Sequence, residues 1–189
     1  MGKMIYELLL VCSPAIFAGI FHMVVVKYNW FCFLSYPLDH KKTFRGKRIF
    51  GDNKTYRGLV AMVLLAAAFS WYYQYFLMSY KSVFEHNLLW LDSAFAWFQY
   101  GVLFGVGYVV GELPNSFYKR QKDIQPGKSN GFWTKIIDQF DSVVSVLVLL
   151  LLFSDFTWNH FWFGLVFFGL FHAAVNVLLY IIGLRKEPF

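Results

Sequence analysis

Long runs of apolar residues alternate with polar stretches along the whole chain. Four of the runs approach the ~20 residues that an α-helix needs to cross a bilayer. They cover about residues 5–26, 59–79, 94–113 and 161–183. A fifth run, residues 142–153, reaches crossing length only if it begins near Asp138 and ends near Thr157. This pattern predicts an all-α integral membrane bundle with about five transmembrane helices.

Composition supports this fold class. Apolar residues make up 58% of the chain and charged residues only 15%, which is far from the balance of a soluble domain. The 189 residues fit one domain. We therefore expect residues 1–189 to form a single membrane domain, with two polar loops at about residues 27–58 and 114–141.

The charges predict an orientation. Of the 17 lysines and arginines, all except Lys3 and Lys81 fall in the two polar loops or in the C-terminal tail. Such residues collect on the cytoplasmic side of a membrane. We expect an N-terminus outside, a cytoplasmic C-terminus, and a site that faces the cytoplasm from a multi-pass protein of the cell (inner) membrane. Cys12, inside a helix, and Cys32, on the reducing side, are not expected to form a disulfide.

The first polar loop contains the segment GDNKTYRG, residues 51–58. Lys54 and Arg57 can neutralise phosphate oxygens, and Asn53 and Thr55 can orient them by hydrogen bonds. The glycines at both ends, Gly51 and Gly58, allow a ligand to approach the backbone closely. Attraction of the loop to anionic lipid is the alternative explanation for these charges.

The second polar stretch contributes two further groups of candidate residues. Glu112, Ser116, Lys119 and Asp123 are spaced to share one face of a helix, with Arg120 adjacent, although Pro114 can interrupt that helix. An interfacial helix with solvated basic side chains is the alternative.

Asp138 and Asp141, three residues apart, form the other group. Together with phosphate oxygens they fit a magnesium site. The competing explanation is that both aspartates lie at a helix N-terminus, where capping and the helix dipole favour them.

Polar residues and glycines inside the runs predict helix packing. His22, His172 and Asn176 are interpreted mainly as donors and acceptors of interhelical hydrogen bonds. Gly101, Gly105, Gly107 and Gly111 predict close approach between helices.

Two segments carry a family resemblance. Residues 36–58, YPLDHKKTFRGKRIFGDNKTYRG, resemble the N-terminal signature of the CDP-archaeol synthases. Residues 111–141 are similar to the C-terminal signature that this family shares with phosphatidate cytidylyltransferases, through GELPNSFYKR, IQPGK and DQFD. Glu112 stands where an aspartate is usual. The His-Gly-Gly of the phosphatidate enzymes is absent, which favours the CDP-archaeol branch.

The resemblance implies a CTP-dependent cytidylyltransferase of phospholipid biosynthesis. Its partners would be CTP, Mg²⁺ and a lipid monophosphate in the membrane, with no nucleic acid and with a homodimer left open. The implied catalytic residues are Lys54, Arg57, Lys119, Arg120, Asp138 and Asp141. The implied substrate-binding residues are Asn53, Thr55, Ser116, Gly51, Gly58, Pro126 and Gly127. The implied metal ligands are Asp138, Asp141 and Glu112.

Two other functions remain open at this point. A phosphatidate cytidylyltransferase would use the same site to make CDP-diacylglycerol. A non-enzymatic lipid-binding or transport protein would explain the basic loops without a metal requirement, although a transporter would more often show symmetry between its halves.

Overall fold

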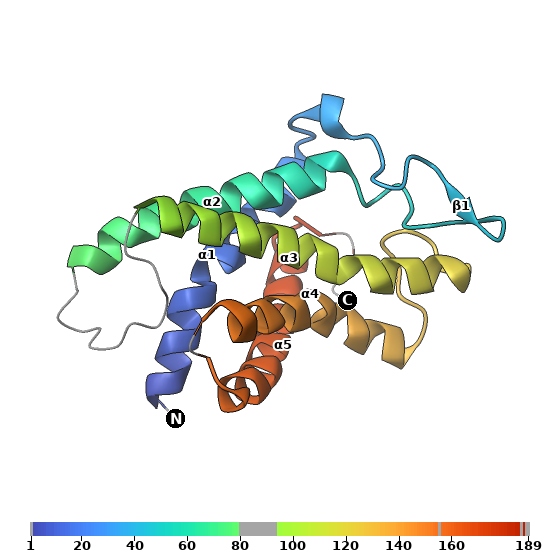
Figure 1. Ribbon diagram of the computed structural model, residues 1–189. Coiled ribbons are helices and arrows are strands. Elements are labelled where there is room, and N and C mark those ends of the chain that lie inside the picture. The colour runs from blue at the N-terminus through green and yellow to red at the C-terminus, as the bar shows by residue number, and fades with distance from the viewer. Residues whose placement is uncertain (1, 80–93, 155, 186, 188–189) are drawn as a thin grey trace.

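Helices make up most of the structure, a computed structural model that describes residues 2–79, 94–154, 156–185 and 187 (Figure 1). Five long α-helices occur in this part of the chain, together with a short 3-10 helix and a two-stranded antiparallel hairpin. The helices are α1 (Gly2–Lys27), η1 (Cys32–Leu34), α2 (Tyr56–Ser79), α3 (Ala94–Gln121), α4 (Phe132–Phe153) and α5 (Trp158–Ile181). The hairpin pairs β1 (Thr43–Phe44) with β2 (Lys47–Arg48). The predicted all-α bundle is confirmed.

Three of the helices are long and apolar enough to cross a membrane by length and composition: Met4–Lys27 in α1, and all of α4 and α5. The other two have similar lengths, 24 residues in α2 and 28 in α3. They are less apolar because they carry polar side chains such as Gln74, Glu112 and Lys119. The fold is thus that of an integral membrane protein, and the direction in which its termini face stays a prediction.

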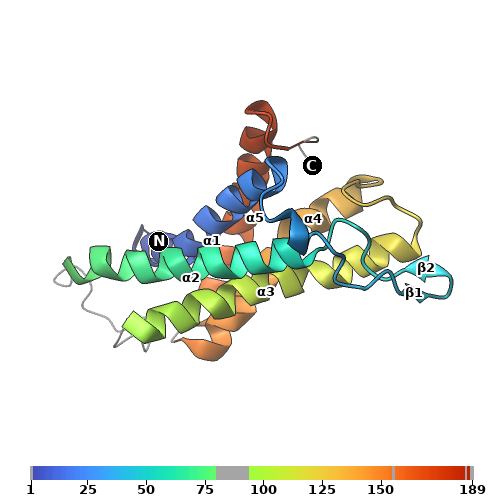
Figure 2. The same ribbon diagram turned by 90° about the horizontal axis from the view of Figure 1, so that it is seen from above.

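Helices α2 and α3 run side by side (Figures 1 and 2). Helix α1 packs against α2, α4 packs against α3, and α5 packs against α4 and α1. Glycines permit the close contacts. A Cβ at Gly101 would lie 2.5 Å from the carbonyl oxygen of Ala66 in α2, and one at Gly111 would lie 2.8 Å from that of Asp141 in α4. Close packing lets van der Waals contacts hold helices together where no hydrophobic effect acts between them. The predicted role of the α3 glycines is confirmed.

All five helices contribute to the buried core. Four of the helices supply side chains whose exposed fraction is 2% or less: Leu8 and Ala18 of α1, Met62 of α2, Phe104 of α3 and Leu147 of α4. Phe161 and Phe168 bring α5 against the same cluster. This core lies toward the middle of the bundle and leaves one end to the polar loops.

Two predicted boundaries were wrong. Helix α3 continues through Pro114 to Gln121, so the proline does not interrupt it. Helix α4 begins at Phe132, well before the predicted start near Asp138. Most of the polar stretch 114–141 is therefore helical, and the connection between α3 and α4 is only residues 122–131. Asp123 lies in that connection with φ +58°, so its predicted place on the helical face of Glu112 was wrong. Helices can start and end in polar sequence when one of their faces lines a polar site.

The polar segments meet at one end of the bundle, as the sequence predicted. The hairpin, the C-terminal end of α3 and the N-terminal end of α4 lie together in both views (Figures 1 and 2). Lys47 links them, because its Nζ donates to the carbonyl oxygen of Gln121 at 2.8 Å and to Asp123 at 2.5 Å.

Candidate active site

A cavity of about 460 Å³ opens where all five helices approach the polar end of the bundle. Its lining includes all of the predicted site residues except Gly51 and Pro126. Those present are Asn53, Lys54, Thr55, Arg57, Gly58, Glu112, Ser116, Lys119, Arg120, Gly127, Asp138 and Asp141. The structure therefore brings two segments together that are more than 50 residues apart in the sequence.

Gly51 and Pro126 lie just behind the lining, against Arg120. A Cβ at Gly51 would lie 2.9 Å from Nη1 of Arg120 and 3.1 Å from Pro126, and φ at this glycine is +94°. A side chain at this position would be strained and would push the guanidinium away. Gly51 and Pro126 thus position Arg120 rather than line the cavity themselves.

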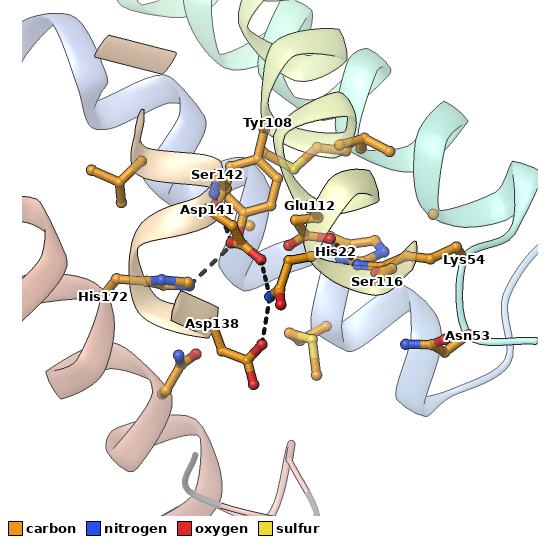
Figure 3. Close-up of a pocket in the computed structure, with 18 of the residues that line it drawn as sticks. His22, Asn53, Lys54, Tyr108, Glu112, Ser116, Asp138, Asp141, Ser142 and His172 are labelled. Atoms are coloured by element: carbon orange, nitrogen blue, oxygen red, sulfur yellow. Dashed lines mark hydrogen bonds and ion pairs between the residues drawn. The ribbon is translucent and has the colours of Figure 1, made fainter. Parts of the chain in front are cut away.

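Asp138 and Asp141 point into the cavity from α4, and one amide holds both (Figure 3). Nδ2 of Asn115, on α3, donates to Asp138 at 2.6 Å and to Asp141 at 2.7 Å. Asp138 also accepts from Lys119 at 2.5 Å and from the hydroxyl of Ser129. The two carboxylates are therefore fixed side by side.

Helix capping does not explain these aspartates. The N-cap of α4 is Gly131, and the first turn of the helix contains no acidic residue. Asp138 and Asp141 lie in its second and third turns, beyond the reach of the free N–H groups. The alternative interpretation of the pair as capping residues is wrong, and both side chains face the cavity instead.

The carboxylate pair fits Mg²⁺. Oxygen ligands suit this ion, which is held by one or two carboxylates with substrate phosphates and water completing its coordination. Among the described residues no cluster of three or more His, Cys, Asp or Glu side chains is close enough to hold a metal. The protein's share of such a site would be Asp138 and Asp141. Glu112, the third predicted ligand, faces the same cavity and stays a prediction.

Glu112 and Lys54 form an ion pair that connects α3 to the first polar loop. Both side chains are largely buried, with exposed fractions of 24% and 17%. A buried carboxylate of this kind needs a charged partner. The pair holds the GDNKTYRG segment against α3, so the predicted nucleotide-binding loop is anchored to the helix that carries Ser116 and Lys119.

Some charges around the cavity have no partner of opposite sign. Lys54 and Lys119 are paired with carboxylates, but Arg57, Arg120 and Arg185 form no ion pair among the described residues. Asp141 likewise has no cationic partner in the part of the chain that the structure describes, although it is mostly buried. Planar guanidinium groups bind phosphate through paired hydrogen bonds. The cavity thus offers guanidinium groups that can bind phosphate and a carboxylate that can bind a cation.

Asp39 fixes the shape of the first polar loop from outside the cavity. Its side chain is fully buried and accepts hydrogen bonds from the N–H groups of Lys41, Phe50 and Gly51, each at 3.0 Å. Arg48 donates to it at 2.7 and 3.2 Å. Burial alone would raise the pKa of this carboxyl. The hydrogen bonds from Arg48 and the three N–H groups outweigh burial and hold the pKa well below its ordinary range.

Asp39→Asn is expected to loosen this loop. A depressed pKa means that the ionised carboxylate stabilises the fold above the unfolded value of about 3.9, and that this contribution is lost only as pH falls through the lower folded value. The amide removes the charge at neutral pH. Tryptic cleavage after Lys54 in the detergent-purified protein should become about tenfold faster or more.

Asp52→Asn is the matched control for this experiment. Asp52 also pairs with Arg48, at 2.7 Å, but its side chain is 70% exposed. Cleavage after Lys54 should change little in this variant, because exposed ion pairs contribute little. Equal cleavage rates in Asp39→Asn and the unmodified protein would show that Asp39 does not hold the loop.

Helix α5 contributes polar groups as the sequence predicted. His172 contacts the carbonyl oxygen of Gln139 at 3.1 Å, and Asn176 donates to the Gln139 side chain at 2.8 Å. Their interpretation as interhelical hydrogen-bonding residues is confirmed. His22 differs: its Nε2 is buried and has no hydrogen-bond partner among the described residues, and it lines the cavity beside Gly58 (Figure 3).

Four residues at or near the site were missed by the sequence reasoning: Asn115, Ser129, Arg185 and Asp39. Asn115 and Asp39 lie within segments already quoted, GELPNSFYKR and residues 36–58, and Ser129 directly follows IQPGK. Helical spacing offered a signal for Asn115, since it lies three residues after Glu112 and four before Lys119. Nothing in the spacing pointed to Asp39 or Arg185, because their positions depend on tertiary contacts.

The whole chain matches one protein family. The family described as CarS-like, CDP-archaeol synthase, matches residues 2–189. The CDP-archaeol synthase of Methanococcoides burtonii is 30% identical over 161 residues, which is 81% of this chain and 90% of that protein. The CDP-archaeol synthase of Methanoculleus marisnigri is 32% identical over 168 residues, with 81% and 89% covered.

A solved structure has the same fold. It is described as an intramembrane enzyme for archaeal membrane lipids biosynthesis, and it superposes with a TM-score of 0.63 over 89% of this chain and 92% of its own. The two sequences are 20% identical, so the likeness concerns the fold. It supports the arrangement of the helices as a membrane bundle.

Proposed function

The chain belongs to the CDP-archaeol synthase family, and from that premise we propose that it is a CTP:lipid-phosphate cytidylyltransferase. Membership of this family makes it a membrane enzyme of CDP-lipid formation. The finer proposal is that the substrates are CTP and a lipid monophosphate with isoprenoid ether chains. The observation that carries it is the cavity, whose lining combines a carboxylate pair and unpaired arginines with apolar side chains of α1 and α5.

The proposed reaction exchanges one phosphoanhydride for another. An oxygen of the lipid phosphate attacks the α-phosphorus of CTP, the bond between that phosphorus and the bridging oxygen to the β-phosphorus breaks, and pyrophosphate leaves with the electron pair. The attacking oxygen is already an anion, so no strong general base is needed. The difficulty is to bring two polyanions together in line, which makes positioning and charge neutralisation the main sources of catalysis.

The described residues divide this work between them. Arg57 and Arg120, free of carboxylate partners, are proposed to bind the phosphates of CTP. Lys119 lines the same cavity and holds Asp138 in place. Asn53, Thr55 and Ser116 offer neutral hydrogen-bonding groups at the same wall. The nucleotide would thus lie between the loop before α2 and the end of α3.

Asp138 and Asp141 are proposed to hold Mg²⁺. When bound there, this ion would neutralise charge on the nucleotide phosphates and on the departing pyrophosphate. Asn115 keeps the two carboxylates together, and Lys119 and Ser129 orient Asp138. Asp141, whose carboxylate has no cationic partner among the described residues, is the one most available to the ion.

Charge distribution supports a cytoplasmic site. Together, the two polar loops carry most of the basic residues of the chain, and they form the end of the bundle where the cavity lies. We propose that this end faces the cytoplasm, where CTP is available, in the cell membrane.

Release of pyrophosphate by the purified protein tests the proposal. With CTP, magnesium and an unsaturated isoprenoid ether-lipid phosphate in detergent micelles, we expect pyrophosphate and CDP-lipid in equal amounts, and none without lipid or with EDTA. Matched reactions with phosphatidate test the lipid class. Faster release with phosphatidate would make the chain a phosphatidate cytidylyltransferase. No release with either lipid, from protein that remains folded, would overturn the proposed activity.

A further inference from the structure

One side of the cavity is apolar and belongs mainly to the first and last helices. We call it the apolar wall: Ile16, Ile20 and Met23 of α1 with Phe168, Phe171 and Val175 of α5. The two helices touch on either side of it. Gly164 packs against Leu8 toward one end, and Gly183 lies near the Nζ of Lys27 at the other. The apolar wall and the polar groups thus line one and the same cavity.

The end of α5 brings a cation to this wall. Gly183 has φ +72°, which ends the helix in a left-handed turn. The N–H of Leu184 then donates to the carbonyl oxygen of Leu179 at 2.7 Å, and the N–H of Gly183 donates to that of Tyr180 at 2.9 Å. These two bonds define a Schellman motif. A third bond, from the N–H of Arg185 to Leu179 at 3.0 Å, keeps the next residue folded back over the helix end.

Arg185 lines the cavity as a result of this turn. Its backbone is held against Leu179, which is 4% exposed and also lines the cavity. Its guanidinium forms no ion pair with any residue in the described ranges. Burial of a cation near apolar surface is unfavourable unless an anion joins it. The arginine thus lines the same cavity as the apolar wall and the carboxylate pair, without an ion-pair partner among the described residues.

We propose that Arg185 binds the phosphate of the lipid substrate while the apolar wall holds the first part of its chains. This rests on the proposed function, which requires two separate sets of phosphates in one cavity. Arg57 and Arg120 lie on α2 and α3, beside the predicted nucleotide loop, whereas Arg185 follows α5. A lipid phosphate held by Arg185 has its chains against α1 and α5 and its oxygens facing the site of the nucleotide.

Steady-state kinetics with both substrates varied separately tests this assignment. Arg185→Ala should raise KM for the lipid phosphate by about 10- to 100-fold, because a charged hydrogen bond to phosphate is lost. KM for CTP should stay unchanged. In Arg185→Lys, KM for the lipid phosphate should lie between the values for the unmodified protein and Arg185→Ala, since lysine keeps the charge but not the planar guanidinium. This milder variant also serves if Arg185→Ala does not fold.

Lys27→Ala is the matched control. Lys27 lies beside Gly183, at the same end of the bundle, but it does not line the cavity. Removing it should leave KM for the lipid phosphate as in the unmodified protein. An equal rise in both variants would mean general attraction of anionic lipid, and would overturn the assignment.

Different results would contradict the proposed function and the proposed role of Arg185. An unmodified protein that releases no pyrophosphate with any lipid contradicts the cytidylyltransferase itself. An active protein in which Arg185→Ala changes KM for CTP, or changes neither KM, contradicts only the role of Arg185.

Discussion

Asp141→Asn is expected to reduce pyrophosphate release by about 10²- to 10³-fold, a loss of the size seen when one preorganised group that stabilises transition-state charge is removed. Asp141 is mostly buried, accepts hydrogen bonds from Asn115 and from the N–H of Ser142, and has no cationic partner among the described residues. Asparagine keeps the shape but not the negative charge that would attract Mg²⁺. The magnesium concentration required for half-maximal rate should therefore rise as well, which loss of packing alone would not produce.

The controls separate a metal site from a structural role. Asp138→Asn should also lose activity, with some loss of stability because Lys119 would lose its carboxylate partner. Asp123→Asn should behave as the unmodified protein, since Asp123 is 75% exposed and pairs with Lys47 outside the cavity. Unchanged turnover and unchanged magnesium dependence in both Asp138→Asn and Asp141→Asn would remove the metal assignment.

Lys54→Met should both destabilise the protein and abolish most of its activity. Lys54 is the buried partner of Glu112, and breaking such a pair leaves one charge uncompensated at a cost of about 3–5 kcal/mol. The same change frees the GDNKTYRG segment from α3. A lower Tm in detergent and a large rise in KM for CTP are the expected measurements.

The double variant Lys54→Met with Glu112→Gln separates the two effects. It removes both charges, so much of the lost Tm should return, because a neutral pair avoids the uncompensated buried charge. Activity should stay low, since the loop and α3 are no longer joined by charge. Full recovery of activity with stability would show that the pair is structural only. It would remove Lys54 from the predicted catalytic residues and Glu112 from the predicted metal ligands.

Much of the site could be predicted from local sequence. The apolar runs gave the helices to within a few residues for α1, α2 and α5. Helical spacing correctly placed Ser116 and Lys119 on one face of α3, and both line the cavity. The start of α4 was the main error. Its first six residues are mixed in polarity, so hydropathy alone could not extend the helix back to Phe132.

The remaining parts depend on contacts between distant segments. Asn115 is recognisable only when α3 and α4 are seen together, since its partners are more than 20 residues away. The role of Asp39 depends on hydrogen bonds from three backbone N–H groups, which come together around its carboxylate only when the loop is folded. The cavity-facing position of Arg185 follows from a turn at Gly183 and from the packing of α5 against α1, neither of which has a hydropathy signature.

The apolar wall has a consequence for how the enzyme would meet its substrates. On the proposed function, a lipid held against α1 and α5 never leaves the bilayer, and only the nucleotide and pyrophosphate pass through water. The effective concentration of the lipid substrate is then its mole fraction in the surrounding membrane. Diluting it with inert lipid at constant bulk concentration should slow the reaction, as in surface-dilution kinetics. A cell could accordingly set the rate of CDP-lipid supply through the composition of the membrane itself.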